Sequence, residues 1–145
     1  MSAILIGSHD AKFVPIGSDA YIEDRLIGCK VIVIRHETIG DIVGHFGPLK
    51  NQLCLDTIKE LSGQVYQDNL PRIIDIYSIS EMPCFIHGWE QYRNCLPFPT
   101  RDPDLALELI SGMKELFPTS DLLLHPYESV STFAYVGRVP LFWKI

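Results

Sequence analysis

Apolar side chains recur along this chain with the two spacings that distinguish helices from strands. From Asp102 to Phe117 they return every three or four residues, which places them on one face of a helix. Asp102 can cap the first turn, Pro103 fits its first position and Pro118 ends it. The segment predicts an amphipathic helix, and its apolar face must pack against a sheet.

A second helix is predicted from Pro48 to Ser62 by the same spacing. Gly63 follows it and fits the left-handed conformation that often ends a helix. The opposite face is polar, so one side of the helix should meet the sheet and the other solvent. The apolar face is expected to contain Leu53, Cys54, Thr57, Ile58 and Leu61.

Short runs rich in β-branched residues predict the strands. Cys29 to Arg35 is the clearest, and its nearly continuous apolar character indicates a central strand covered on both faces. Pro71 to Ile79 is the next, with Ile74 and Ile76 on one face and Asp75 on the other. Asp75 is either a strand-edge residue or a paired buried carboxylate.

The remaining strand-like runs lie near the two ends of the chain. Ala3 to Ile6 and Phe13 to Ile16 are expected to form a hairpin or meander, and a turn follows at Gly17 to Asp19. Ala20 to Ile27 is compatible with one or two helical turns or with an irregular link. The last strands are predicted at Asp121 to Leu124, Ser131 to Val136 and Val139 to Ile145. The proline of the final strand indicates that it lies at the edge of the sheet.

The order of these elements predicts the fold class. Runs of adjacent strands favour antiparallel pairing, so the chain should be α+β: a mainly antiparallel sheet of six or seven strands with two amphipathic helices packed on one face. A chain of 145 residues can bury a sufficient core as one unit. Residues 1–145 are therefore expected to form a single globular domain.

Composition narrows the classes of function. The net charge is −6 and no run of Lys or Arg occurs, which argues against nucleic acid as the main ligand and suits a basic protein partner. No apolar run approaches the roughly 18 residues of a membrane span and no signal peptide is found, so a cytoplasmic protein is expected. The four cysteines are expected to be reduced, and no metal or cofactor motif occurs.

The segment from His36 to Pro48 has two interpretations. Glu37, Asp41 and His45 are four residues apart, so on a helix they would share a face and could bind a divalent cation. Two glycines lie between these positions, and each weakens a helix by about 1 kcal/mol. The favoured interpretation is a polar loop that leads into the next helix.

One triplet in this segment suggests chemistry. His36-Glu37-Thr38 resembles one of the two H-x-T triplets of two-histidine phosphoesterases, but the second triplet is missing. The enzyme alternative is a small phosphodiesterase or nucleotide hydrolase in which His36 and His45 serve as acid and base. Thr38 would contact the phosphoryl oxygens.

The segment from Glu81 to Arg101 has no regular pattern and is the most aromatic part of the chain. Its three prolines exclude a continuous helix. Cys84 and Cys95 could act as nucleophiles only if a base lay close. The segment is either a recognition surface or a satellite core, and in the first case the expected binding residues are Trp89, Glu90, Tyr92, Arg93 and Phe98.

One longer pattern resembles a known group of proteins. Gly44-His45-Phe46-Gly47-Pro48 leads into L-K-N-Q-L-C-L-D-T-I-K-E-L-S-G-Q-V-Y-Q-D-N, and a strand, an aromatic loop, a late helix and a terminal F-W-K-I follow. This layout is similar to that of small immunity proteins of bacterial polymorphic toxin systems. The resemblance concerns the arrangement of elements and carries over no catalytic residue. It implies a protein that binds and neutralises a cognate toxin through a surface.

The sequence therefore favours a binding protein over an enzyme. The first expectation is an immunity-type inhibitor that occludes the active site of a toxin enzyme. The alternatives are the hydrolase described above and a small-ligand sequestering protein, whose aromatic segment would surround a cavity in a monomer or across a dimer interface. No cofactor is expected in the favoured case.

Overall fold

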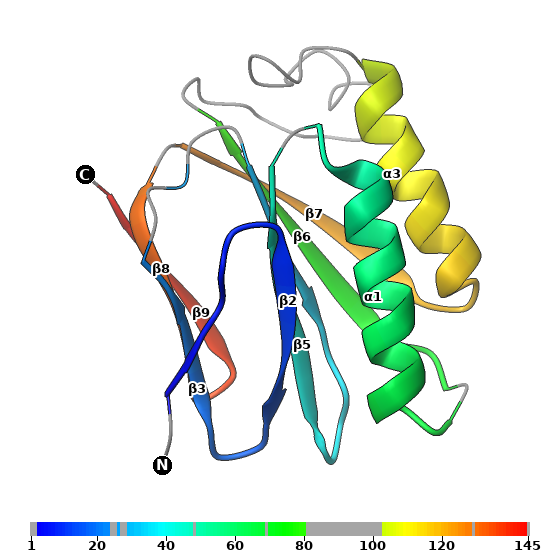
Figure 1. Ribbon diagram of the computed structural model, residues 1–145, viewed down its shortest axis with the longest axis horizontal. Coiled ribbons are helices and arrows are strands. Elements are labelled where there is room, and N and C mark those ends of the chain that lie inside the picture. Colours follow the sequence, from blue (N-terminus) through cyan, green and yellow to red (C-terminus); the bar gives the residue numbers. More distant parts are fainter. Residues whose placement is uncertain are drawn as a thin grey trace.

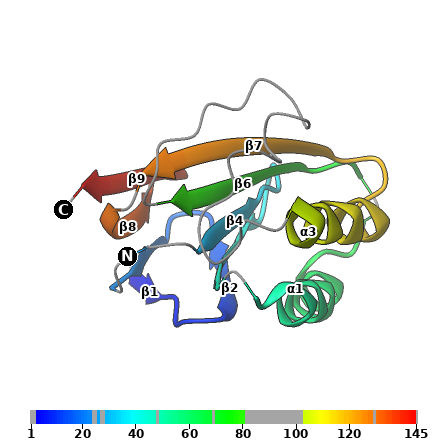
Figure 2. The same ribbon diagram turned by 90° about the horizontal axis from the view of Figure 1, so that it is seen from above.

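The computed structural model describes residues 3–23, 26, 29–47, 49–68, 70–80, 103–128 and 130–144. These residues form three layers (Figure 1). Two helices cover one face of a five-stranded sheet, and a four-stranded sheet lies against the other face (Figure 2). The predicted α+β class is confirmed.

The five-stranded sheet is built around the strand that the sequence identifies most clearly. β4 (Lys30–Ile34) lies in the middle of the order β2-β5-β4-β6-β7, and all five of its residues are buried. This position confirms the prediction of a central strand covered on both faces. The other strands are β2 (Asp10–Pro15), β5 (Gly40–Phe46), β6 (Ile73–Ser80) and β7 (Asp121–Glu128).

The four-stranded sheet combines strands from the beginning and the end of the chain. Its order is β1-β3-β8-β9, so β9 lies at an edge, as Pro140 predicts. The segment that starts at Ala20 begins as a strand, contrary to both interpretations of its sequence. The strands are β1 (Ala3–Leu5), β3 (Asp19–Ile22), β8 (Val130–Val136) and β9 (Val139–Lys144).

The strands pair mainly antiparallel, as predicted, but they form two mixed sheets and not one sheet. The described residues form nine strands rather than six or seven, and two of their seven pairings are parallel. β6 and β7 are parallel because α3 (Pro103–Leu116) lies between them in the chain and returns it to the same end of the sheet. β1 and β3 are parallel because β2, between them, pairs in the other sheet, so the expected hairpin of the first two strands does not form.

The two helices pack on one face of the five-stranded sheet, as predicted. α3 ends next to Pro118, and Leu109, Ile110 and Met113 on its inner face are buried.

No helix among the described residues has the length and apolar character needed to cross a membrane.

The bounds and the buried face of α1 (Asn51–Val65) differ from the prediction. The helix passes through Gly63, which is therefore not its stop, and Tyr66 follows it in an extended conformation. Leu53 is exposed, whereas Leu55 packs against the core. The buried face is therefore turned by less than one residue from the prediction: Cys54, Ile58 and Leu61 lie on it as predicted, and Leu55 takes the place of Leu53.

Each face of the central sheet has its own core. Alternation along β4 sends Ile32 and Ile34 toward the helices, and Val31 and Val33 toward the four-stranded sheet. β6 alternates in the same way and as predicted, with two isoleucines toward the helices and the side chains of residues 77 and 79 toward the other sheet. The two cores therefore bury both faces of β4.

The segment from His36 to Pro48 differs most from its prediction. Gly40 to Phe46 is neither a polar loop nor a helix but the strand β5, and all seven of its residues are buried. A Cβ atom at Gly44 would lie 2.9 Å from the Phe46 ring, so this glycine permits close packing. The two polar residues of β5 must find partners inside the protein, and this requirement leads to the candidate site.

Candidate functional site

A network of charged side chains joins the two sheets at the end where β4 connects to β5. Asp41, on β5, is 1% exposed. Its carboxylate accepts hydrogen bonds from the Tyr135 hydroxyl (2.6 Å), from Nε and Nη2 of Arg138 (3.0 and 2.7 Å) and from the backbone N–H of His36 (2.9 Å). Asp41 therefore ties β5 to β8 and to the turn between β8 and β9.

Asp75, on β6, holds the second part of the network. Nε of Arg35 donates to its Oδ2 at 2.8 Å, and Nε2 of His125 lies 2.8 Å from its Oδ1. Nη1 of Arg35 donates onward to the Tyr135 hydroxyl at 2.9 Å, which connects the two carboxylates. Because β6 lies between β4 and β7, Asp75 is the paired buried carboxylate and not a strand-edge residue.

The pKa of Asp75 is lowered in the folded protein. Burial opposes its ionisation, but the hydrogen bonds from His125 and Arg35 outweigh this effect. A lowered pKa means that Asp75 stabilises the fold at pH values above its ordinary pKa of about 4. This contribution is lost as the pH falls through the lower value of the folded state.

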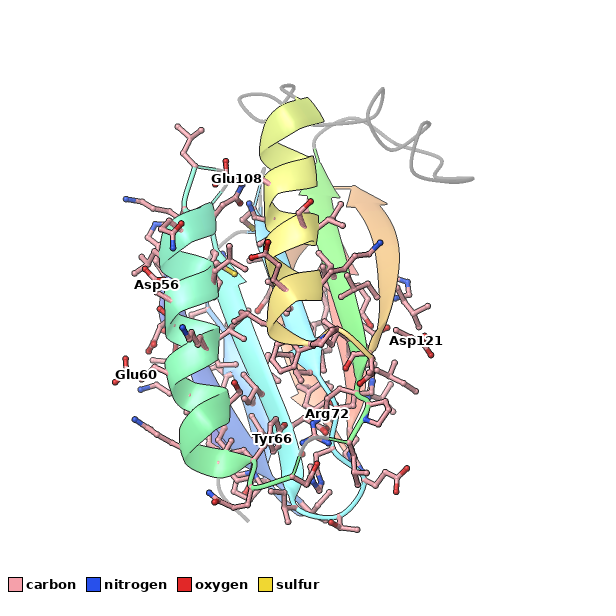
Figure 3. All side chains as sticks on the ribbon, turned by 90° about the vertical axis from the view of Figure 1, so that its right-hand side faces the viewer. Asp56, Glu60, Tyr66, Arg72, Glu108 and Asp121 are labelled. Atoms are coloured by element: carbon pink, nitrogen blue, oxygen red, sulfur yellow. The ribbon has the colours of Figure 1, made fainter. Side chains whose placement is uncertain are left out.

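We therefore expect a loss of stability in acid that depends on Asp75. Urea unfolding between pH 7 and pH 2 should show a shallower acid decline in Asp75→Asn than in Asp121→Asn, a control at an exposed residue on the margin of the sheet (Figure 3). Equal acid slopes in the two variants would contradict the role given to Asp75.

A third group of side chains continues the network at the link between α1 and β6. The His36 ring stacks on Tyr66, and Nε2 of His36 lies 3.0 Å from Oδ2 of Asp68. Arg72 donates to Oδ1 of Asp68 at 2.6 Å, and its guanidinium lies over the Tyr66 ring (Figure 3). The hydrogen bonds from His36 and Arg72 lower the pKa of Asp68.

Both ring nitrogens of His36 have hydrogen-bond partners. The backbone N–H groups of Thr38 and Ile39 donate to Nδ1 at 3.1 and 3.4 Å, so the proton of the neutral ring lies on Nε2, which donates to Asp68. This arrangement leaves neither nitrogen for proton transfer to a substrate. Thr38 lies beside the ring, with Oγ1 3.5 Å from Nδ1, and helps to fix the connection between β4 and β5.

His45 lies far from His36. It is four residues along β5 from Asp41, which contacts His36, so the two histidines lie at opposite ends of the strand, roughly 13 Å apart along it. The structure does not bring His36, Thr38 and His45 together.

The described residues also contain no group of three His, Cys, Asp or Glu side chains suited to a metal ion, so Glu37, Asp41 and His45 do not form the cation site considered from their spacing.

His45 lies near a cysteine instead. Val31 of β4 is opposite His45 in the ladder, and Cys29 precedes Val31 by two residues. All three side chains therefore point to the same side of the sheet, into the core between the sheets. Diagonal neighbours of this kind have Cα atoms roughly 7–8 Å apart, and Cys29 and His45 are both buried.

Lys30, at the start of β4, is a buried charge that the sequence analysis missed. Its ammonium donates to Oδ1 of Asn51, at the start of α1, at 2.7 Å. Burial lowers the pKa of Lys30 and raises the pKa of the neighbouring Cys54 thiol to about 12. A lysine within the apolar run C-K-V-I-V-I-R is the signal that indicates such a site.

The surface of the four-stranded sheet that points away from the core is apolar and exposed. We call it the outer face; it consists of the side chains that alternate away from the core along β1, β3, β8 and β9. Ala3, Tyr21, Thr132 and Ala134 belong to it. Five larger apolar side chains on it are between 38% and 53% exposed: Leu5, Val136, Val139, Leu141 and Trp143.

Charged side chains are scarce on the outer face. Among its described residues only Asp19 is charged, and its Oδ1 accepts a hydrogen bond from the Gly137 N–H at 3.2 Å. Four short strands give this face an area of about 300 Å², at the lower end of the range found for the largest apolar patch of a typical monomer, which is often functional. The sequence shows alternation in β9 but not that β8, β3 and β1 extend the same surface.

The binding residues that the sequence predicts lie outside the described residues. This applies to the whole segment from Glu81 to Arg101, including Cys84 and Cys95. The role of this segment as an interface or a satellite core stays a prediction, and so does the binding role of Trp89, Glu90, Tyr92, Arg93 and Phe98.

No protein-family model matches this chain, and no curated protein sequence matches it. The charged network, the Cys29–His45 pair and the outer face are therefore the features from which a function can be inferred. The network is used mainly within the fold, whereas the outer face has no described partner layer.

Proposed function

We propose that this chain is a binding protein and that the outer face contacts a protein partner. The observation that carries the proposal is the exposure of five large apolar side chains on one sheet face. When a partner covers such side chains, the binding free energy becomes more favourable by about 25 cal/mol for each Å² of apolar surface removed from water. A contiguous patch of this kind is typical of interaction sites.

β9 supplies a second means of binding at the margin of the outer face. It is an edge strand and pairs only with β8 among the described strands. The main-chain groups along such an edge can pair with a strand of another protein. Trp143 lies on β9 and is of the residue type that most often dominates binding energy in interfaces.

In its narrower form, the proposal is that the partner is a toxin enzyme whose active site is occluded. The resemblance to immunity proteins supports this form, and the net charge of −6 suits a basic partner. Asp56 and Glu60 project from the side of α1 that points away from the sheet (Figure 3). These carboxylates lie across both sheets from the outer face, so the net charge of the whole molecule, rather than charges beside the contact surface, would accelerate association with a basic partner.

Site-specific photo-cross-linking in the native host tests the proposal. A photoreactive residue at Leu141 should capture one defined protein, because Leu141 lies within the outer face. The same residue at Leu53, which is similarly exposed but lies on α1, should not capture it. Equal capture from both positions, or none from position 141, would exclude the outer face as the binding surface.

The placement of Cys29 and His45 favours a second candidate function, acyl transfer by a thiol. An imidazole beside a thiol can accept its proton, and the resulting thiolate can attack the carbonyl carbon of an ester or thioester. The alcohol or thiol of the substrate then leaves with the proton from the imidazole, and water hydrolyses the acyl-thiol to release the acid. The observation that supports this candidate is that both side chains lie on one face of neighbouring strands. Cys54 has no such neighbour described, and burial raises its pKa.

Alkylation rates distinguish this candidate from two inert core thiols. If His45 activates Cys29, iodoacetamide at pH 7 should modify Cys29 about tenfold faster than Cys54, as read by mass spectrometry of the peptides. His45→Gln should remove the difference. A Cys29 rate equal to that of Cys54, or one unchanged in His45→Gln, would rule out an activated thiol.

A further inference from the structure

A cavity of about 760 Å³ opens beside the charged network, where β4 ends and β6 begins. This volume is within the range of small-molecule sites, roughly 300–1,000 Å³. Arg35, Arg72 and Arg138 all line it, although they come from three separate segments of the chain. We call it the arginine cavity.

The carboxylates that pair with these arginines leave N–H donors unused. The hydrogen bonds of Arg35 employ Nε and Nη1, so Nη2 has no partner among the described residues. The hydrogen bonds of Arg72 employ only Nη2. Its Nε and Nη1 therefore have no hydrogen-bond partner among the residues that the structure describes. Asp41 and Asp75 are buried behind the arginines, and neither lines the cavity.

Arg72 is the most enclosed of the three arginines. Its side chain is 6% exposed, and its guanidinium carbon lies 4.5 Å from the centre of the Tyr66 ring. It lines the arginine cavity and also a second cavity, of about 830 Å³, at the ends of the two helices. The two donors of Arg72 without an acceptor among the described residues are open to water in the cavities, so an anion there can accept hydrogen bonds from them.

Two carboxylates also line the arginine cavity and oppose an anion. Both oxygens of Asp68 already accept hydrogen bonds, from His36, from Arg72 and from the Leu70 N–H. Glu37 is exposed to water, which screens its charge. Each of the three arginines is paired with one carboxylate, Arg35 with Asp75, Arg72 with Asp68 and Arg138 with Asp41, so an anion would be held by the N–H donors that these pairs leave over and not by an excess of positive charge.

The lining also contains His36, Thr38 and three apolar residues. Two of the apolar residues, Leu70 and Ile73, are 65% and 48% exposed and flank Pro71 and Arg72 in the chain. We propose that the arginine cavity binds a small organic anion, a phosphate ester or a carboxylate. Its charged group contacts the arginines, and its apolar body lies against Leu70 and Ile73. This site is separate from the outer face and does not depend on the function proposed for it.

Calorimetric titrations with phenyl phosphate, phenylacetate and inorganic phosphate test the proposal. At least one of the two organic anions should bind saturably and about tenfold more tightly than inorganic phosphate, because only the organic anions bury apolar surface. Tighter binding of phenyl phosphate identifies a phosphate ester, and tighter binding of phenylacetate a carboxylate. The absence of saturable binding by both organic anions would overturn the proposal.

Charge changes at Leu70 locate the site without disturbing the arginines. A charge at an exposed position roughly 8 Å from the bound anion changes its affinity about twofold at low ionic strength. Leu70→Glu should weaken binding and Leu70→Lys should strengthen it by this factor, whereas Leu53→Glu, on α1, should leave it unchanged. Equal affinities in Leu70→Glu and the unmodified protein would place the anion elsewhere and refute the assignment.

Discussion

Replacing Asp41 with alanine is expected to lower the free energy of unfolding by about 3–5 kcal/mol. The carboxylate is 1% exposed and accepts hydrogen bonds from Tyr135, Arg138 and the His36 N–H. Its removal leaves the Arg138 guanidinium and the Tyr135 hydroxyl without their acceptor, at the point where the two sheets meet. Urea unfolding followed by circular dichroism measures the change.

A matched variant separates the loss of this network from the loss of a carboxylate as such. Asp121→Ala removes an exposed side chain and should change stability by no more than about 0.5 kcal/mol. Asp41→Asn should fall between the two, because an amide oxygen still accepts from Arg138 but the charge is lost. A loss below about 1 kcal/mol in Asp41→Ala would show that the network does not hold the sheets together.

Gly40→Ala is expected to destabilise the protein by about 3 kcal/mol or more. Gly40 has a φ of +142°, a conformation that L side chains rarely adopt. An added Cβ atom would clash with the Val14 carbonyl oxygen and lie 2.7 Å from Cα of Pro15, and neither backbone atom can move without separating β2 from β5. Thermal and urea unfolding measure the effect.

Gly63→Ala is the matched control for a glycine replaced in a regular element. Gly63 lies inside α1, and an added Cβ would have no heavy atom within 4 Å. Alanine there should stabilise the protein by about 0.5–1 kcal/mol, because glycine is costly in a helix interior. Losses of similar size in the two variants would contradict the strain assigned to Gly40.

The sequence predicts those parts of the fold whose apolar pattern is continuous. The run from Cys29 to Arg35 is correctly predicted as a central strand. The helix before Pro118 is also predicted correctly, because its apolar face continues over several turns. The strand β5 is missed because glycine, aspartate and histidine interrupt its apolar residues. These residues look like a loop until Asp41 is seen to have partners in β8 and in the β8–β9 turn.

The order of the strands along the chain does not predict that they divide into two sheets. Neighbouring runs favour hairpins, yet β2 leaves β1 and pairs with β5, and β8 returns to pair with β3. These pairings join residues far apart in the chain, so no local pattern encodes them.

The same separation in the chain hides the candidate sites. Asp75 is recognised as a buried carboxylate because it lies between isoleucines, but its partners Arg35 and His125 cannot be inferred from spacing. The outer face is also hidden, because it is assembled from strands at both ends of the chain. The alternative catalytic pair of His36 and His45 is not brought together, because the length of β5 separates two histidines that are close in sequence.

The central claim is that the outer face binds a protein partner, and the affinity of the partner captured at position 141 tests it most directly. Calorimetry should show that Leu141→Lys weakens binding by about 2 kcal/mol or more, because the change places a charge within the apolar contact surface. Leu53→Lys, at a similarly exposed leucine on α1, should change it by less than about 0.5 kcal/mol. If Leu141→Lys binds as tightly as the unmodified protein while Leu53→Lys binds less tightly, the contact surface lies on the helices and the claim is wrong.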